Sequence, residues 1–179
     1  RPGGSQAARL ALRVPPHGTA GRLGQPTAVR AGPPPTSRLG VALAEVATGG
    51  YVSSRLAAAP GADDVFRGSV VVHQSDVAAL LLGPEIGSEA SEAATVTLAR
   101  QARLTLGADV GLAVAGVVAA AEGTDARPVG TVSLAAVVPV GSGSLEEVVV
   151  TVRLPGDRER IRQFAAISLL DLLRRTLEA

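Results

Sequence analysis

Apolar residues from Gly40 onward fall into two kinds of pattern, short continuous runs and stripes with helical spacing. The continuous runs are typical of buried strands, because both faces of such a strand are covered. They predict strands at residues 41–44, 69–73, 109–115, 129–138 and 147–154.

The helically spaced stripes predict four helices. One follows the glycines at 49 and 50, and Ser75 can cap a short one that runs through Leu82. Ser91 can cap a third, which ends before Gly107 and has Ala94, Leu98, Ala102 and Leu106 along one face. The last begins after Pro155-Gly156-Asp157. Its expected buried stripe is Ile161, Phe164, Ala165, Leu169, Leu172 and Leu173.

The order of these elements predicts the fold class. Strands and helices alternate in the first half, which favours parallel pairing with crossover helices. The turn Gly141-Ser142-Gly143 is too short for a crossover, so the two strands beside it must be antiparallel. We therefore expect a three-layer α/β/α domain with a mixed, mostly parallel sheet over residues 40–179.

Residues 1–39 have a different composition and are expected to form an irregular arm. They contain seven prolines and no apolar periodicity, so they cannot build a packed core. Residues 1–44 carry six arginines and no acid, whereas residues 45–179 carry eleven arginines and sixteen acids. The net charges of +6 and −5 describe a basic arm before an acidic domain.

The composition excludes several kinds of chemistry. Cysteine and lysine are both absent, which excludes disulfides, thiolate catalysis, cysteine-ligated metals and Schiff bases. His17 and His73, the two histidines, lie far apart in the sequence. We expect no metal site and no cofactor. No apolar run approaches the roughly eighteen residues that a membrane-spanning helix needs.

The segment Gly40 to Leu56 is the strongest candidate for a site. Glu45 ends a predicted strand, and Thr48, Gly49 and Gly50 lead into a predicted helix. A helix N-terminus at the carboxyl end of a strand suits an anion, because free N–H groups and the helix dipole converge there. A tight turn uses the same residues and is the alternative. Ser53 and Ser54 have no base beside them in this motif.

Several short motifs occur in a recognisable order. They are Ala44-Glu45 with Thr48-Gly49-Gly50, Pro60-Gly61-Ala62, Leu106-Gly107-Ala108-Asp109, Pro128-Val129-Gly130-Thr131-Val132, and Pro155-Gly156-Asp157-Arg158 with Arg162. Together they resemble the CinA C-terminal domain family, the nicotinamide-nucleotide amidohydrolases, over roughly residues 40–178. The resemblance implies an α/β fold, deamidation of nicotinamide mononucleotide, and a homodimer.

The reactive positions depart from the family pattern. The family motif A-E-S-C-T-G-G places its nucleophilic serine where this chain has Val46, and acyl transfer needs an activated oxygen or sulfur. His73 and Ala78 replace a tyrosine and a lysine, and the second glycine-rich motif begins Ala115-Gly116 and continues through Glu122 without its hydroxyl or proline.

These departures predict a domain without catalytic residues. The residues expected to line a vestigial ligand pocket are Glu45, Thr48, Gly49, Gly50, His73, Gly116 and Arg158. Our interpretation is an inactive, structural or accessory subunit of a larger assembly. A working amidohydrolase with relocated residues and a nucleotide sensor that binds without turnover are the alternatives.

The arm predicts the partners. An arginine-rich segment broken by prolines is expected to lie on protein neighbours, or on RNA if its arginines meet phosphates. An acid-free start without an initial methionine is typical of an imported protein that has lost part of a presequence. That indicates a mitochondrial location, with the bacterial cytoplasm as the alternative.

Overall fold

The computed structural model describes residues 39–73, 77, 91–118, 124, 127–140 and 143–178. The chain divides into two units, residues 1–36 and residues 37–179, and every described residue belongs to the second. All of the predicted arm except Leu39 lies outside the described residues. So does most of the short helix predicted from Ser75 to Leu82. Among the described residues, no helix has both the length and the apolar character needed to cross a bilayer.

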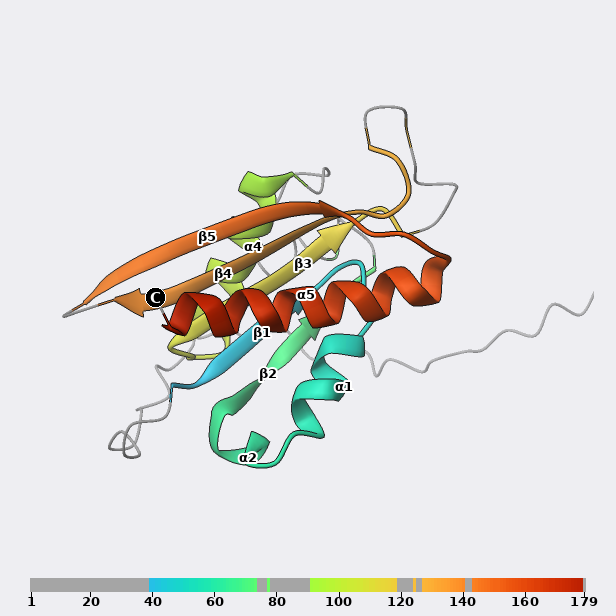
Figure 1. The fold of residues 1–179 in the computed structure, drawn as a ribbon. Helices are drawn as coiled ribbons and strands as arrows, with labels where there is room; N and C mark the ends of the chain where they lie inside the picture. Colours follow the sequence, from blue (N-terminus) through green and yellow to red (C-terminus); the bar gives the residue numbers. More distant parts are fainter. Residues whose placement is uncertain are drawn as a thin grey trace, which may run out of the picture. The chain divides into compact units, whose positions relative to one another are not determined.

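A five-stranded sheet forms the centre of the second unit, in the order β2-β1-β3-β4-β5 (Figure 1). β1 pairs in parallel with β2 and β3, and β3–β4 and β4–β5 are antiparallel. Four of the five strands therefore point the same way. The bounds are β1 Val41–Glu45, β2 Phe66–Val71, β3 Val110–Gly116, β4 Thr131–Val140 and β5 Ser144–Arg153.

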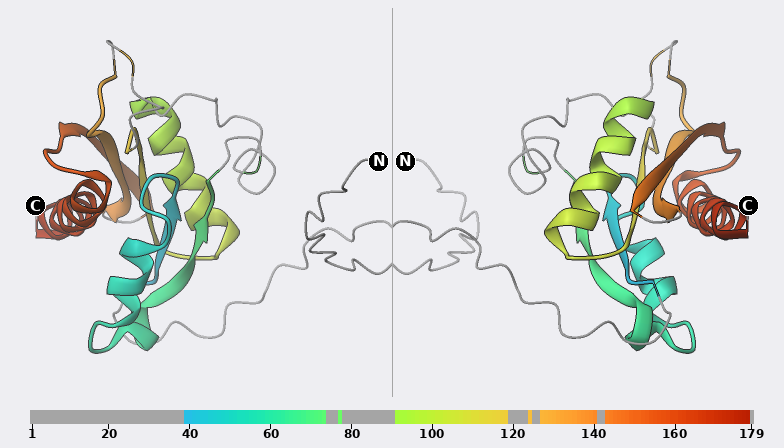
Figure 2. Two further views of the ribbon diagram at one scale, coloured as in Figure 1. Left: turned by 90° about the vertical axis from the view of Figure 1, so that its right-hand side faces the viewer. Right: turned by 90° about the vertical axis from the view of Figure 1, so that its left-hand side faces the viewer.

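Helices cover both faces of this sheet. α4 (Glu92–Thr105) packs on one face, and α1 (Tyr51–Ala57) and α5 (Arg158–Glu178) pack on the other (Figure 2). A short helix, α2 (Ala62–Val65), joins α1 to β2 and was not predicted. The structure confirms the three-layer α/β/α architecture with a mixed sheet.

Side chains along β1 alternate between these two layers. Leu43 belongs to the core beneath α1 and α5, whereas Ala42 and Ala44 face α4. Successive residues of a strand point to opposite faces, so this short run supplies both cores. All five residues of β1 are buried, which explains why the sequence shows a continuous apolar run and no alternation.

The α4 side of the sheet is built from small residues, and this lets the helix approach closely. Ala99 and Ala102 of α4 are fully buried against Ala113 and Ala135. A Cβ at Gly111 of β3 would collide with the carbonyl oxygen of Ala99 and lie 2.8 Å from Cβ of Arg103. The absence of a side chain at Gly111 therefore sets the distance between α4 and the sheet.

The buried stripe of α5 matches the prediction except at one position. Ile161, Ala165 and Leu169 are at most 1% exposed, and Leu172 and Leu173 are partly buried. Phe164 is 39% exposed, so its place in the stripe was wrong. The buried positions recur at intervals of four, which leaves the residue before Ala165 on the flank of the helix.

β2 differs from the predicted strand at both ends. It begins at Phe66, earlier than predicted. Val41 pairs with Phe66 and Ala42 with Gly68, so a register shift leaves Arg67 as an extra residue of β2 without a partner on β1. Gly68 follows with φ 136°, a backbone conformation that favours glycine. The strand ends at Val71, so His73 lies beyond it.

We expect Gly111→Ala to lower the free energy of unfolding by about 1–3 kcal/mol, because α4 must move away from β3. The matched control is Gly40→Ala, whose new Cβ would meet the flexible side chain of Arg67 at 3.1 Å. Urea denaturation of both variants checks this. Equal stabilities for the two would show that α4 does not depend on close contact at Gly111.

Leu169→Ala should lower the free energy of unfolding by about 2–5 kcal/mol, because this side chain of α5 is fully buried against the sheet. Leu177 is 48% exposed near the end of the same helix, so Leu177→Ala should change stability by about 0.5 kcal/mol or less. Thermal or urea denaturation compares the two. Similar small losses at both positions would mean that α5 does not pack on the sheet.

Candidate functional site

The carboxyl ends of the parallel strands meet at one edge of the sheet. The register places Glu45 beside Val71 of β2 and Val114 of β3, and Gly116 beside Val132 near the start of β4. Arg153, at the end of β5, pairs with Thr131 at this same edge. The loops before α1 and α5 therefore start from one side of the sheet, where ligand sites of open α/β sheets occur.

Glu45 is the polar centre of this edge and is fully buried. Its Oε2 accepts hydrogen bonds from the Thr48 hydroxyl and from the N–H groups of Gly50 and Val52, both at 3.1 Å. Its Oε1 accepts one from the N–H of Ser53 at 2.8 Å and one from the Ser53 hydroxyl. The carboxylate thus acts as a charged cap on the first turn of α1.

These five hydrogen bonds use the acceptor capacity of the carboxylate, which has about four lone-pair sites. The first-turn N–H groups that sequence reasoning assigned to an external anion bind a side chain of the chain itself. Ser53 was expected to lack a base nearby, yet its hydroxyl donates to Glu45. The Ser53 hydroxyl is therefore part of the cap on α1.

Gly49 and Arg162 form the outer part of the same loop. Gly49 is exposed and has φ 61°, and the guanidinium of Arg162 occupies the space where a Cβ would lie. Nε of Arg162 donates to the carbonyl of Thr48 at 2.8 Å. Arginine has five N–H donors, so the other donors of this guanidinium remain near the glycine turn.

The remaining predicted pocket residues are more dispersed. His73 and Arg158 are exposed, the first beyond β2 and the second at the start of α5. A Cβ at Gly116 would lie 2.5 Å from the carbonyl oxygen of Thr131, so this glycine is required for strand packing. Hydrogen bonds join Glu45, Thr48 and Gly50. No hydrogen bond among the described residues links them to His73, Gly116 or Arg158.

Val46 stands where the resemblance places a nucleophilic serine. It is partly buried, it packs with the core on the α4 side, and its N–H donates to Val114 at 3.0 Å. The parallel register ends at Glu45, which pairs with Val71 and Val114, so the next residues along the flanking chain segments are Val72 and Ala115. Position 46 is therefore held firmly by the sheet, with apolar residues on both sides.

Hydrogen bonds link two hydroxyl groups and a carboxylate on β4, β5 and α4, near Ala115. This cluster was not predicted from the sequence. Ser133 of β4 pairs with Ala115 and is 1% exposed. Its hydroxyl lies 3.0 Å from that of Thr151, which donates to Glu92 at 2.7 Å. A serine inside an otherwise apolar strand was the available signal, but its partners come from β5 and α4.

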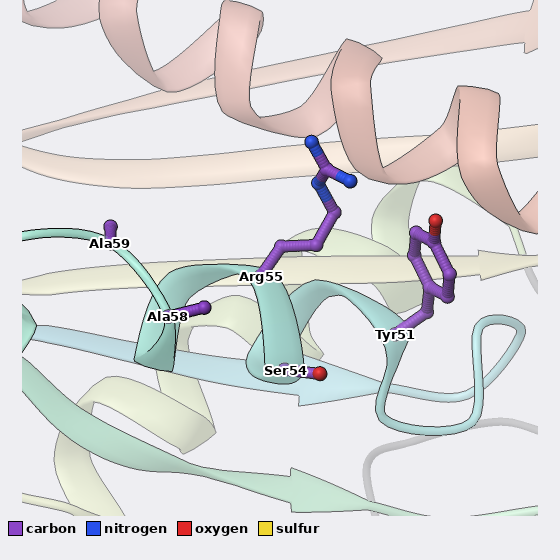
Figure 3. Close-up of a pocket in the computed structure, with 5 residues that line it drawn as sticks. All are labelled: Tyr51, Ser54, Arg55, Ala58 and Ala59. Atoms are coloured by element: carbon purple, nitrogen blue, oxygen red, sulfur yellow. The ribbon is translucent and has the colours of Figure 1, made fainter.

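An open groove of about 450 Å³ runs along α1 and the turn that follows it. It is lined by Tyr51, Ser54, Arg55, Ala58 and Ala59. Figure 3 shows the side chains of Tyr51 and Arg55 extending toward α5, which contacts α1. The groove contains none of the seven predicted pocket residues.

The carboxyl groups whose pKa values are lowered lie away from this edge of the sheet. Hydrogen bonding to Arg100 lowers the pKa of Glu147, at the far end of β5. Hydrogen bonds from Arg174 and Arg175 lower the pKa of Asp171, in α5. Within the described ranges, no three His, Asp or Glu side chains cluster as metal ligands.

The fold and this edge define a three-layer α/β domain in which the last residue of β1 caps the start of α1. A model of the CinA C-terminal domain matches residues 35–177. The chain belongs to that family.

Relatives and solved structures agree with the assignment. The chain is 42% identical to a CinA-like protein of Frankia casuarinae over 142 residues, which cover 76% of this chain and 31% of that protein. A CinA-like protein of Acidobacterium capsulatum is 39% identical, with 76% and 33% covered. The chain spans about a third of the length of these curated relatives. The crystal structure of a competence or damage-inducible protein from Enterobacter asburiae has a TM-score of 0.65 and 26% identity, with 76% of this chain and 87% of that chain covered.

Glu45→Gln should lower the free energy of unfolding by about 3 kcal/mol, because an amide leaves backbone N–H groups of α1 without an acceptor. The matched control is Glu92→Gln, an exposed residue that accepts one hydrogen bond from Thr151. Urea denaturation at neutral pH measures both. A Glu45→Gln variant as stable as the Glu92→Gln control would contradict the capping role.

Proposed function

We propose that this chain is a non-hydrolysing member of its family that serves as a structural or accessory subunit. The resemblance implies deamidation of nicotinamide mononucleotide, and the family membership supports a role of that type for the scaffold. The observation that carries our proposal is Val46, because its side chain cannot form the acyl intermediate that a serine would form.

The surroundings of Val46 support this proposal. The side chains of Val72 and Ala115, which follow the last residues paired with Glu45, are buried and apolar, so neither side chain can accept a proton from a nucleophile. The nearest polar cluster, around Glu45, is committed to capping α1. Position 46 therefore has no nucleophilic atom, and the side chains of the two residues beside it offer no base, which supports a non-hydrolysing role.

A nucleotide sensor is the second candidate, and the arrangement around Gly49 favours it. Arg162 directs a guanidinium to the exposed glycine turn, and Arg158 lies one helical turn earlier in α5. Guanidinium groups bind phosphate through charge-assisted hydrogen bonds. A phosphate would bind here outside the helix start, on the arginines, because Glu45 occupies the N–H groups.

The purified chain should release no ammonia from nicotinamide mononucleotide above the rate of a buffer blank. An ammonia assay, calibrated by known additions of ammonia, measures the rate. Release that rises in proportion to protein concentration and persists through further purification would refute the proposal. Calorimetric titration with the same nucleotide separates the two candidates, since a sensor binds it and an accessory subunit does not.

Val46→Ser alone should also remain inactive. Val72 and Ala115, which flank this point of the sheet, have apolar side chains, so neither supplies a base to activate the new hydroxyl. Val46→Ala is the matched control, because it shortens the side chain without adding an oxygen. Deamidation by the serine variant but not by the alanine variant would show that activating groups are still in place.

A further inference from the structure

The groove along α1 contains a phenol and a guanidinium on one face of the helix. Tyr51 and Arg55 are four residues apart, so their side chains lie one above the other on the helix surface. Both extend toward α5 (Figure 3). Among the described residues, no hydrogen bond or ion pair engages the hydroxyl of Tyr51 or the guanidinium of Arg55.

The end of α1 provides little for Arg55 to bind. An arginine in the last turn of a helix can donate to the carbonyl groups of that turn. Here the N–H of Ala58 donates to the carbonyl of Ser54 at 3.2 Å, and the N–H of Ala59 donates to that of Leu56 at 3.1 Å. None of the five residues that line the groove is acidic. The groove therefore holds a cation without supplying an anion for it.

Tyr51 is held more firmly than an ordinary surface side chain. It is half-buried and packs against the core beneath α1 and α5. The ring therefore has few alternative positions, and its hydroxyl lies at the groove beside α5 (Figure 3). A donor that is fixed in advance loses less conformational freedom when a ligand binds, so this hydroxyl is well suited to hydrogen-bond a ligand.

The lining of the groove matches a carboxylate attached to an apolar body. A guanidinium presents parallel N–H donors that fit the two oxygens of a carboxylate, and a phenol hydroxyl can donate a further bond. Ala58 and Ala59 are exposed and supply methyl groups within the same groove. A phosphate monoester carries about two negative charges at neutral pH, whereas Arg55 is the one cation among the lining residues.

We propose that this groove binds a small apolar carboxylic acid as its carboxylate, with Arg55 and Tyr51 holding the carboxylate and the two alanines contacting the apolar body. The volume of about 450 Å³ lies within the range of small-molecule sites. The site is separate from the Glu45 cap, because no side chain that lines the groove takes part in that cap.

The composition of the chain provides a reporter for this site. Tyr51 is the single tyrosine and tryptophan is absent, so tyrosine fluorescence comes from the groove alone. Cyclohexanecarboxylate is a suitable probe, and cyclohexanecarboxamide is its uncharged control. Titration of the full chain is followed by this fluorescence and by the ¹H–¹⁵N amide signals of Arg55 and Ala58. We expect saturable binding of the carboxylate, and binding of the amide that is weaker by about tenfold or more, because the charge-assisted bonds are lost.

Two variants with the same change in charge test the role of the guanidinium. Arg55→Gln should raise the dissociation constant of cyclohexanecarboxylate about tenfold or more, because its amide cannot form the ion pair. Arg153→Gln, an exposed position at the end of β5, should leave the constant unchanged. Circular dichroism verifies that each variant is folded.

Two further variants test where the apolar body lies. Ala58→Leu should abolish binding by filling the groove, while Arg55 stays in place. Ala57→Leu is the matched control, because Ala57 is exposed in α1 but does not line the groove. The proposal would be overturned if neither the fluorescence nor the amide signals saturate with the carboxylate. Equal affinities in the Arg55→Gln and Arg153→Gln variants, or in the two leucine variants, would also contradict it.

Discussion

The buried carboxylate of Glu45 is the constraint on which the described part of this domain depends. A charged group without water is unfavourable unless it is fully hydrogen-bonded, and Glu45 achieves this by accepting bonds from the first turn of α1 and from Thr48. The start of α1 and the end of β1 are therefore fixed to each other. Arg162 adds α5 to this arrangement through the carbonyl of Thr48.

The same constraint relates the fold to the proposed function. Because Glu45 is fixed, the next residue, Val46, is fixed at the carboxyl edge of the sheet, between Val72 and Ala115. The chain keeps the means of positioning a group at this point but has an alkyl side chain there. The alkyl side chain at this fixed position is the observation on which the proposed function rests.

Much of the fold could be predicted from the sequence, because periodicity reports burial directly. The apolar runs located all five strands, and the stripe of Ala94, Leu98 and Ala102 located the buried face of α4. The bulge at Arg67 and the exposure of Phe164 depend on neighbouring elements, which local patterns do not contain. The contacts of Arg162 with the glycine turn and of Ser133 with Thr151 are long-range and were missed for the same reason. The predictions for the arm, for Ala78 and for the loop through Glu122 concern residues outside the described ranges and stay predictions.

The most direct test of this account follows the amides of α1 in solution. In a ¹H–¹⁵N spectrum of the full chain, the amides of Gly50, Val52 and Ser53 should keep their positions while nicotinamide mononucleotide is added, because Glu45 already accepts their hydrogen bonds. Binding by a sensor would instead move the side-chain Nε signal of Arg162. Saturable shifts of the three amides would contradict the account, since they would show that the ligand displaces Glu45 from the helix start.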